Sequence, residues 1–281
     1  MPWGGGSPMK ALKWVVGIFM SLVAFLFISP ILLMAMTSFK HEGDVLNPST
    51  VIPKVWTVEN YTNVLSWAEE APFGKWLLNS IFVSCSVTLL VLLFSSMAAY
   101  AITRLKVPGG SQFLTVVIFS MMVPGQLFLV PVYFILSKLH WLDTPFALII
   151  PASAGGFGVF MLCQFMKAVP TAIEEAAMID GCSLAGVYSK VTLPLIAPAL
   201  ATLGVFTFIG SWNDYVSPLV FMDSVRNYTL PVGIAMYQAS YYTEYGRTLA
   251  TSAMASLPLM IIFLIFQKQI VDSMSATGLK D

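Results

Sequence analysis

The stretch EAAMIDG at residues 175–181, followed by VTLP at residues 191–194, decides how this chain folds. It is a polar island between two long apolar segments, and Gly181 divides it into two short runs. An amphipathic helix, a glycine break and a second short helix suit a loop that fits a groove on a partner protein. A helix that merely caps the bundle would explain the amphipathicity but not the whole spaced pattern. We therefore interpret residues 170–194 as a docking loop.

The apolar segments on either side of this loop belong in a bilayer. Of the 281 residues, 57% are hydrophobic and only 10% are charged, and the mean hydropathy is +0.81. So few charges cannot cover a soluble globule of this length. A membrane-crossing helix needs about 20 apolar residues, and six charge-free runs are long enough: residues 14–39, 76–103, 107–137, 144–166, 191–213 and 248–267. The sequence predicts an all-α membrane protein with six transmembrane helices and the docking loop between helices four and five.

The basic residues indicate the orientation of the chain in the membrane. If the N-terminus is cytoplasmic, eight Lys and Arg residues lie inside and six outside, and the short turn with Arg104 and Lys106 is inside. Short loops follow the positive-inside rule most reliably. We expect residues 1–13 and 272–281 to be cytoplasmic tails and residues 14–271 to be the transmembrane domain. A net charge of zero gives no reason to expect a nucleic acid partner.

Two prolines interrupt the third apolar run. Pro124, which is followed by Gly125, and Pro131 each remove a backbone donor and clash with the preceding turn. The helix must kink or unwind there, and unwound backbone at membrane depth survives where protein or a water-filled cavity covers it. We expect Pro124 and Gln126 to line a substrate pathway. The alternative is a proline kink that only shapes helix packing.

The end of the fifth apolar run carries a polar and aromatic group. Trp212 and Tyr215 offer flat apolar faces, while Asn213 and Asp214 add hydrogen-bonding groups. An intramembrane carboxylate usually faces a cavity or pairs with another group. This combination suits a sugar, which has an apolar C–H face and a rim of hydroxyls. The alternative is an interfacial aromatic belt with an aspartate that reaches the headgroups.

Other motifs carry less information about function. Residues 223–247 form an aromatic external segment, and Tyr237, Tyr241 and Tyr242 are placed to protrude toward a partner. The sequence contains no Gly-x-x-x-x-Gly-Lys-Ser/Thr pattern, so binding of ATP by this chain in the P-loop manner is not expected. Its two histidines are not accompanied by a cluster of metal ligands, and no catalytic arrangement has positional support. We expect neither an enzyme nor a bound metal or cofactor.

The docking loop resembles a known motif. The spacing Glu-Ala-Ala, three residues, Gly, nine residues, an aliphatic residue, one residue, Leu-Pro is similar to the EAA loop of inner-membrane permeases of binding-protein-dependent ABC importers. Most of the chain resembles the maltose-type permeases of carbohydrate importers. The other stretches that support this resemblance are the proline-interrupted residues 122–133, residues 212–215 and residues 227–233.

The resemblance implies a six-helix permease in the inner membrane that works in a complex. Its partners would be a second, homologous permease, two cytoplasmic ATPase subunits that bind ATP and Mg²⁺, an extracytoplasmic solute-binding protein and membrane lipid. Tyr237, Tyr241 and Tyr242 become candidate contacts for the binding protein. The docking loop would be the element that couples to the ATPase, with Glu175 meeting a basic residue there. The coupling residues are Glu174, Glu175, Ala176, Ala177, Asp180, Gly181, Leu193 and Pro194.

The expected cargo is a sugar or an oligosaccharide. An importer for another polar solute, such as glycerol phosphate, a polyol or a peptide, is the alternative, although a phosphate site would be expected to recruit arginine. A secondary transporter driven by an ion gradient should show inverted repeats and a paired intramembrane charge. The sequence displays neither feature.

Overall fold

The computed structural model describes residues 8–47, 50–66, 71–239 and 245–278, and within these ranges the regular structure is entirely helical. The chain forms two compact units. The first unit contains residues 1–67 and 236–254, and the second contains residues 68–235 and 255–281. Two helices, α14 (Leu230–Ala239) and α15 (Tyr245–Gly278), contribute residues to both units.

Besides its parts of α14 and α15, the first unit contains one long apolar helix and a polar cap. These are α1 (Pro8–Ser38), α2 (Glu42–Val45) and α3 (Glu59–Ser66). The end of α1 is held by α3, because the amide of Asn60 donates to the carbonyls of Ser38 and Lys40, each over 2.8 Å. Tyr61 adds a hydrogen bond of 2.6 Å to the hydroxyl of Ser38. These contacts satisfy carbonyls that the helix end leaves free.

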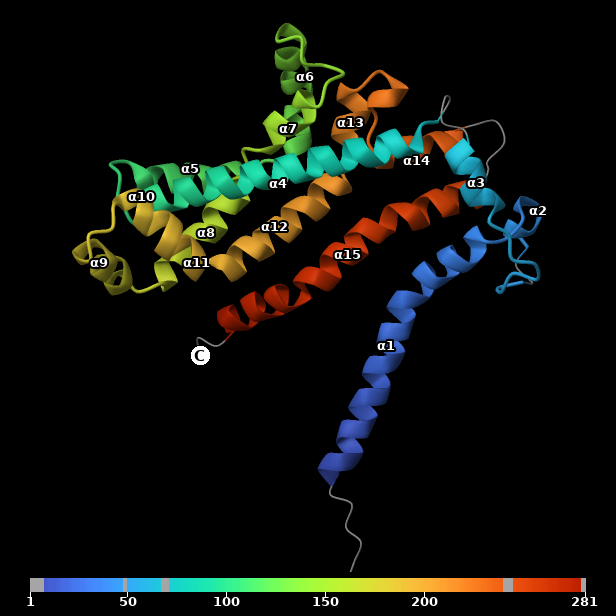
Figure 1. The fold of residues 1–281 in the computed structure, drawn as a ribbon, viewed down its shortest axis with the longest axis horizontal. Helices are drawn as coiled ribbons and strands as arrows, with labels where there is room; N and C mark the ends of the chain where they lie inside the picture. The colour runs from blue at the N-terminus through green and yellow to red at the C-terminus, as the bar shows by residue number, and fades with distance from the viewer. Residues whose placement is uncertain (1–7, 48–49, 67–70, 240–244, 279–281) are drawn as a thin grey trace, which may run out of the picture. The chain divides into compact units, whose positions relative to one another are not determined.

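The second unit is built around α4 (Phe73–Thr103), which packs against two other helices, α8 (Gly156–Ala168) and α12 (Ala197–Trp212). Figure 1 shows these three helices side by side. The core between them contains Val87, Leu162 and Leu203. The other helices of this unit are α5 (Gly110–Ser120), η1 (Gly125–Phe128), α6 (Leu129–Lys138), α7 (Phe146–Ala152), α9 (Thr171–Ile179), α10 (Leu184–Val187), η2 (Tyr188–Thr192), α11 (Leu193–Leu195), α13 (Val216–Phe221) and η3 (Val225–Asn227).

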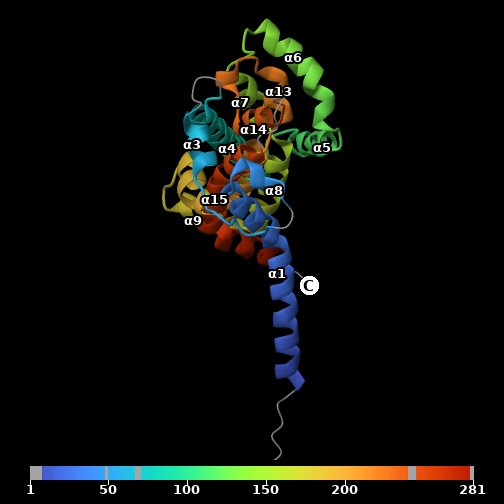
Figure 2. The same ribbon diagram turned by 90° about the vertical axis from the view of Figure 1, so that its right-hand side faces the viewer.

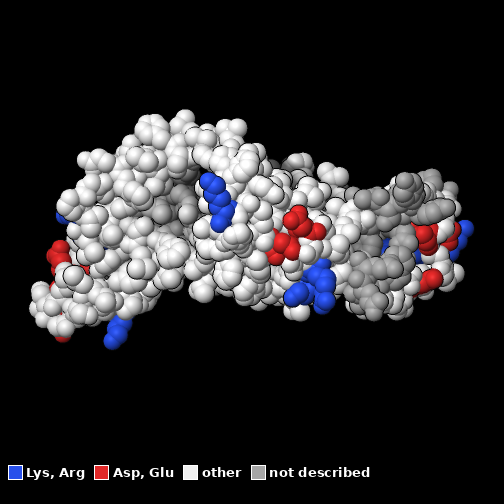
Figure 3. All heavy atoms as spheres, turned by 90° about the horizontal axis from the view of Figure 1, so that it is seen from above, with Lys and Arg blue, Asp and Glu red and all other residues white. Residues whose placement is uncertain are grey.

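Glycines allow the helices of the second unit to approach closely. A Cβ added to Gly158 of α8 would lie 3.0 Å from the Cβ of Ser95 on α4, and one added to Gly156 would lie 3.1 Å from Val117 on α5. Real Cβ atoms rarely come so near to their neighbours, so these positions favour glycine. On the face drawn in Figure 3, the charged side chains of the described residues form small separate groups among uncharged ones.

The third predicted crossing is broken next to Pro124, as predicted, whereas Pro131 lies in the first turn of α6 (Leu129–Lys138), where its missing amide interrupts no helical hydrogen bond. Helix α5 and the η1–α6 segment meet at 95°, and the break falls just before Gly125 (Figure 2). Pro124 lacks the amide that would continue α5, and a proline disfavours helical geometry in the residue before it. The fifth crossing is also bent, by 76° between Leu184–Leu195 and Ala197–Trp212.

The predicted fold class is confirmed. In the described part of the chain, four helices are long and apolar enough to cross a membrane alone, and six crossings result if each bent pair is one span. The fifth crossing ends at Trp212, one residue before the end of the predicted apolar run, and a separate short helix, α13, follows it.

Candidate functional site

The docking loop has the expected two short helices. Helix α9 ends at Ile179, Gly181 has a φ of +85°, and α10 begins at Leu184. Only glycine adopts such a left-handed angle at little cost, so Gly181 permits the sharp turn between the helices. The hydroxyl of Ser183 accepts a hydrogen bond of 3.2 Å from the amide of Gly186 and caps α10.

Most side chains of this loop are exposed, and we call six of them the outward face: Glu175, Ala176, Met178, Ile179, Asp180 and Leu184. Ile179 has 87% of its surface exposed and Leu184 has 56%. Apolar side chains exposed in this way beside charged ones are typical of an interaction site. Gly181 and Pro194 are exposed as well, whereas Ala177 and Leu193 are half-buried.

Glu174 has a different environment from Glu175, although both were predicted to be coupling residues. Its side chain is only 7% exposed, and its Oε1 accepts hydrogen bonds from Arg104 Nε over 2.9 Å and from Thr192 Oγ1 over 2.8 Å. Arg104 also donates through Nη2 to the carbonyls of Met166, over 2.7 Å, and Val169, over 2.9 Å. We call these five residues the Arg104 cluster.

Thr192 reaches this cluster from a π-helical turn, η2. At the other end of the same turn, the hydroxyl of Tyr188 hydrogen-bonds with Ser96 over 2.8 Å, and its ring lies 5.1 Å from that of Tyr100. Both Ser96 and Tyr100 belong to α4. Short π-helical turns often occur at functional sites because they reorient side chains. Here the turn directs one side chain to Glu174 and another to α4.

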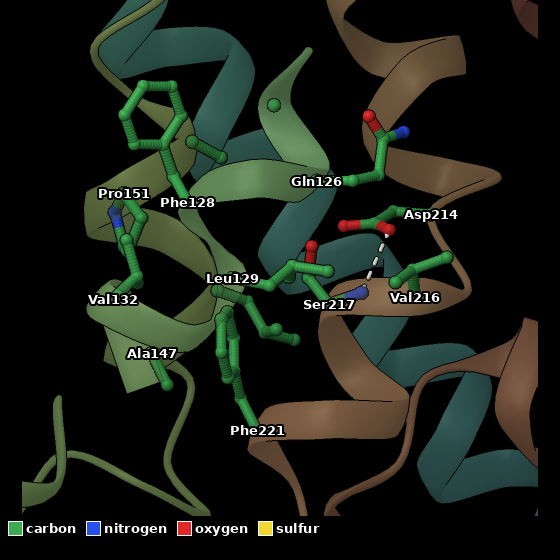
Figure 4. Close-up of a pocket in the computed structure, with 13 residues that line it drawn as sticks. Gln126, Phe128, Leu129, Val132, Ala147, Pro151, Asp214, Val216, Ser217 and Phe221 are labelled. Carbon is green, nitrogen blue, oxygen red and sulfur yellow. Dashed lines mark hydrogen bonds between the residues drawn. The ribbon is translucent and has the colours of Figure 1, made fainter. Parts of the chain in front are cut away.

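A cavity of about 390 Å³ lies where the broken third crossing meets α7 and α13. Figure 4 shows Gln126 and Asp214 close together on its wall, with Ser217 next to them. The remaining lining is apolar or backbone: Gly125, Phe128, Leu129, Val132, Ala147, Leu148, Pro151, Ala152, Val216 and Phe221. The cavity combines a few polar groups with apolar walls, as small-molecule sites do.

Asp214 also lines a second cavity of about 280 Å³. Its Oδ1 accepts a hydrogen bond of 3.2 Å from the backbone amide of Ser217. Ser217 lies in the first turn of α13. Among the described residues that line the two cavities, none is lysine, arginine or histidine. The second cavity is lined by Val83, Val87, Leu148, Ala152, Thr207, Gly210, Ser211, Asp214, Pro218 and Thr229. Such walls offer hydrogen bonds to hydroxyl groups without a cation to pair with an anionic group.

The other predicted pathway residues lie outside these cavities. Trp212 is 3% exposed, stacks on Phe208 at 5.5 Å and donates through Nε1 to the carbonyl of Ala255 over 3.3 Å. The Trp212 ring is therefore not available as a sugar platform in this structure, because it is buried and stacked on Phe208. Asn213 donates to the carbonyl of Ile209, and Tyr215 is exposed.

Pro124 precedes the lining residues of the first cavity, which begin at Gly125. Of the predicted partner contacts, Tyr241 and Tyr242 lie outside the described residues, and Tyr237 is described only as part of the backbone of α14.

Two loops of the second unit are clamped together by Asp143. Its Oδ1 accepts hydrogen bonds from the amides of Asp223, over 3.1 Å, and Ser224, over 3.0 Å. Its Oδ2 accepts from the Ser224 hydroxyl, and its carbonyl accepts from Asn227 over 2.8 Å. Partial burial would raise the pKa of this carboxyl, but the hydrogen bonds from Ser224, Asp223 and Asn227 outweigh burial and lower the pKa.

Comparison with known proteins gives consistent matches over nearly the whole chain. A profile of the family described as "Binding-protein-dependent transport system inner membrane component" matches residues 91–276. The chain is 31% identical over 272 residues to the arabinooligosaccharides transport system permease protein AraQ of Halalkalibacterium halodurans, covering 96% of this chain and 97% of that protein. It is 34% identical over 276 residues to the trehalose/maltose transport system permease protein MalG of Thermococcus litoralis, with coverages of 97% and 98%.

A solved structure supports the same architecture. A chain of a bacterial ABC transporter involved in the import of the acidic polysaccharide alginate matches with a TM-score of 0.80. The match covers 95% of this chain and 99% of that chain at 22% identity. At this identity the similarity establishes the fold.

Proposed function

Since this chain belongs to the family of binding-protein-dependent transport system inner membrane components, we propose that it moves a sugar or an oligosaccharide across the cytoplasmic membrane. In this proposal the chain is the permease subunit of an ABC importer, and ATP is hydrolysed in separate subunits. A solute-binding protein delivers the cargo from outside, as the name of the family implies. Both termini of the chain lie in the cytoplasm.

The outward face of the docking loop is the observation that best supports a role in coupling to an ATPase. Two short helices meet at Gly181 and present Ile179 and Leu184 to the surroundings beside the carboxylate of Glu175. A cleft with an apolar floor and a basic rim would complement this face. We assign that cleft to a cytoplasmic ATPase subunit, which binds ATP and Mg²⁺. Two such subunits and a second, homologous permease complete the complex.

The chemistry of the two cavities supports a neutral, hydroxyl-rich cargo. Gln126, Asp214 and Ser217 supply hydrogen-bonding groups, while Phe128 and Phe221 supply apolar surface. Sugars match this combination because one ring presents both C–H groups and hydroxyls. A permanently anionic cargo would meet the Asp214 carboxylate without a neighbouring cation in either cavity. Glycerol phosphate is therefore disfavoured, whereas a polyol remains the alternative cargo.

In this proposal, transport results because movement of the docking loop is coupled to a change in the two cavities. When ATP binding closes the ATPase pair, the docking loops move with it and the two permeases change between inward-facing and outward-facing states. A ligand shifts such an equilibrium only by its different affinity for the two states. ATP therefore acts through the loop, and the cargo acts through the cavities.

Reconstitution of the complex tests this function. The purified complex of permease, sister permease, ATPase and binding protein is placed in liposomes, and ATP hydrolysis is measured with a panel of neutral sugars, polyols and acidic sugars. We expect a neutral sugar or oligosaccharide to stimulate hydrolysis and to accumulate in the liposomes. Stimulation by acidic sugars alone would contradict the proposed cargo. A permease that purifies without any ATPase would contradict the proposed function altogether.

A further inference from the structure

Two adjacent carboxylates of the docking loop have opposite environments. Glu175 is exposed on the outward face, whereas the Glu174 side chain is 7% exposed and is occupied by Arg104 and Thr192. A carboxylate that is buried and bonded within its own chain cannot also reach a partner protein. Glu174 therefore serves a purpose inside the permease.

Arg104 connects segments that are distant in the sequence. It directly follows α4, and its guanidinium binds Glu174 of α9 and two carbonyls at the end of α8. A guanidinium holds several donors in a rigid plane, so one side chain can fix the positions of several acceptors at once. Thr192 brings the turn before α11 to the same carboxylate. Glu174, near one end of the docking loop, is thus bonded to Arg104 at the end of α4, and Thr192, near the other end of the loop, is bonded to Glu174.

Helix α4 is also fastened at its other end. Trp76 donates through Nε1 to the carbonyl of Val225 over 2.6 Å, and the amide of Asn79 donates to the carbonyls of Arg226 and Tyr228 over 2.9 and 3.0 Å. The helix is continuous over 31 residues. Its residues Val83 and Val87 line the second cavity. When α4 moves as a rigid helix, a displacement of the docking loop that moves Arg104 also moves the wall of this cavity.

We propose that the buried pair of Glu174 and Arg104 is the joint that makes the docking loop and α4 move as one body. Glu174 is then a positioning residue for transport, and Glu175 is the carboxylate that meets the ATPase. This inference rests on the proposed function, because it needs an ATPase that moves the loop. If the joint loosens, the ATPase still binds the outward face and still closes, but the loop shifts relative to α4 and the cavity does not respond.

A purely structural role for the pair predicts a different result. Loss of folding would lower the amount of complex, and transport and hydrolysis would then fall by the same factor. Loss of the joint would lower uptake per ATP hydrolysed. The ratio of uptake to hydrolysis therefore separates the two roles.

The test uses the full reconstituted complex with Glu174→Gln. Glutamine keeps the size of the side chain and an acceptor for Thr192 but removes the charge that holds Arg104. We expect the ATPase to copurify and to hydrolyse ATP, while uptake per ATP falls by about fivefold or more, the range of typical couplings between sites. Lys167→Gln, which removes an exposed charge next to Met166, should keep the wild-type ratio.

If Glu174→Gln keeps the wild-type ratio of uptake to ATP hydrolysis, the proposal of a joint is overturned and the proposed function stays intact. If the wild-type permease brings no ATPase, both the function and the joint are overturned. If Glu174→Gln cannot be purified, Arg104→Lys decides, because lysine keeps the positive charge but lacks the rigid plane of donors that binds Glu174 and the carbonyls of Met166 and Val169 at once. We expect this variant to lower the ratio of uptake to hydrolysis in the same direction, and an unchanged ratio would again overturn the proposed joint.

Discussion

Arg104 Nε lies 2.9 Å from Glu174 Oε1, although the two residues are 70 positions apart in the sequence. Both side chains are almost fully buried. Bringing two charges out of water is costly unless each is paired and hydrogen-bonded. The extra bonds from Thr192 and to the carbonyls of Met166 and Val169 supply those partners.

Removal of Arg104 should destabilise the permease. Arg104→Met leaves the Glu174 carboxylate buried without its cation, and breaking one side of a buried pair costs about 3 kcal/mol or more. We expect a clear fall in the melting temperature of the purified permease in detergent, followed by intrinsic fluorescence. Arg226→Met, at an exposed position, should melt close to the wild type. Equal melting temperatures of the two variants would contradict the burial of the Arg104–Glu174 pair.

Gly233 should tolerate no side chain. A Cβ at this position would lie 2.7 Å from Cζ3 of Trp76 and nearer still to two other atoms of that ring. Trp76 has no exposed surface and is hydrogen-bonded to Val225, so it cannot move aside easily. Gly233→Ala should cost about 1–3 kcal/mol, as overpacking does. Gly74→Ala, where nothing lies within 4 Å, is the matched control and should be harmless in the same melting assay.

The clamp at Asp143 should depend on pH. Because the folded pKa of Asp143 is lowered, the clamp stabilises the protein fully above the unfolded value of about 3.9. This stabilisation is lost as the pH falls through the folded pKa. Asp143→Asn should therefore melt below the wild type at pH 7, and the difference should shrink below about pH 4. A constant difference from pH 7 to pH 3 would rule out the carboxylate as its source.

Asp214 should matter for transport more than for assembly. Its carboxylate lines both cavities, so Asp214→Ala removes an acceptor from the expected cargo path. A hydrogen bond to a charged group contributes about 1.5–3 kcal/mol, and we expect the maximum uptake rate to fall about tenfold or more. Asp223→Ala, outside the lining of either cavity, is the matched control. Unchanged uptake by Asp214→Ala in proteoliposomes would remove this residue from the pathway.

Local sequence signals predicted most of the fold. The charge-free run at residues 76–103 corresponds to α4 (Phe73–Thr103), and Pro124 correctly predicted the break in the third crossing. The resemblance to permeases of carbohydrate importers is confirmed by the profile match and by the similarity to MalG. These features depend on apolar length, on proline geometry and on a spaced motif, all of which are visible within a short window of sequence.

Contacts between distant segments could not be predicted in this way. The motif spacing distinguishes Glu175 as the glutamate that meets a partner, but only the positions of Arg104 and Thr192 in space show that Glu174 is internal. Trp212 was predicted to offer its flat apolar face to a sugar beside Asn213 and Asp214. The end of α12 instead turns its ring toward Phe208. The acceptors of Arg104 are backbone carbonyls, which no residue type in the sequence reveals.

The most direct test of the whole account is to find what touches the docking loop. A photoreactive amino acid replaces Ile179, which is 87% exposed, and a matched probe replaces Leu46, which is 67% exposed in the segment after α1. After irradiation of intact cells, mass spectrometry identifies the protein attached to each probe. The account predicts that position 179 captures a nucleotide-hydrolysing subunit on the cytoplasmic side and that position 46 never does. Capture of an extracytoplasmic protein at position 179, or of the ATPase at position 46, would contradict it.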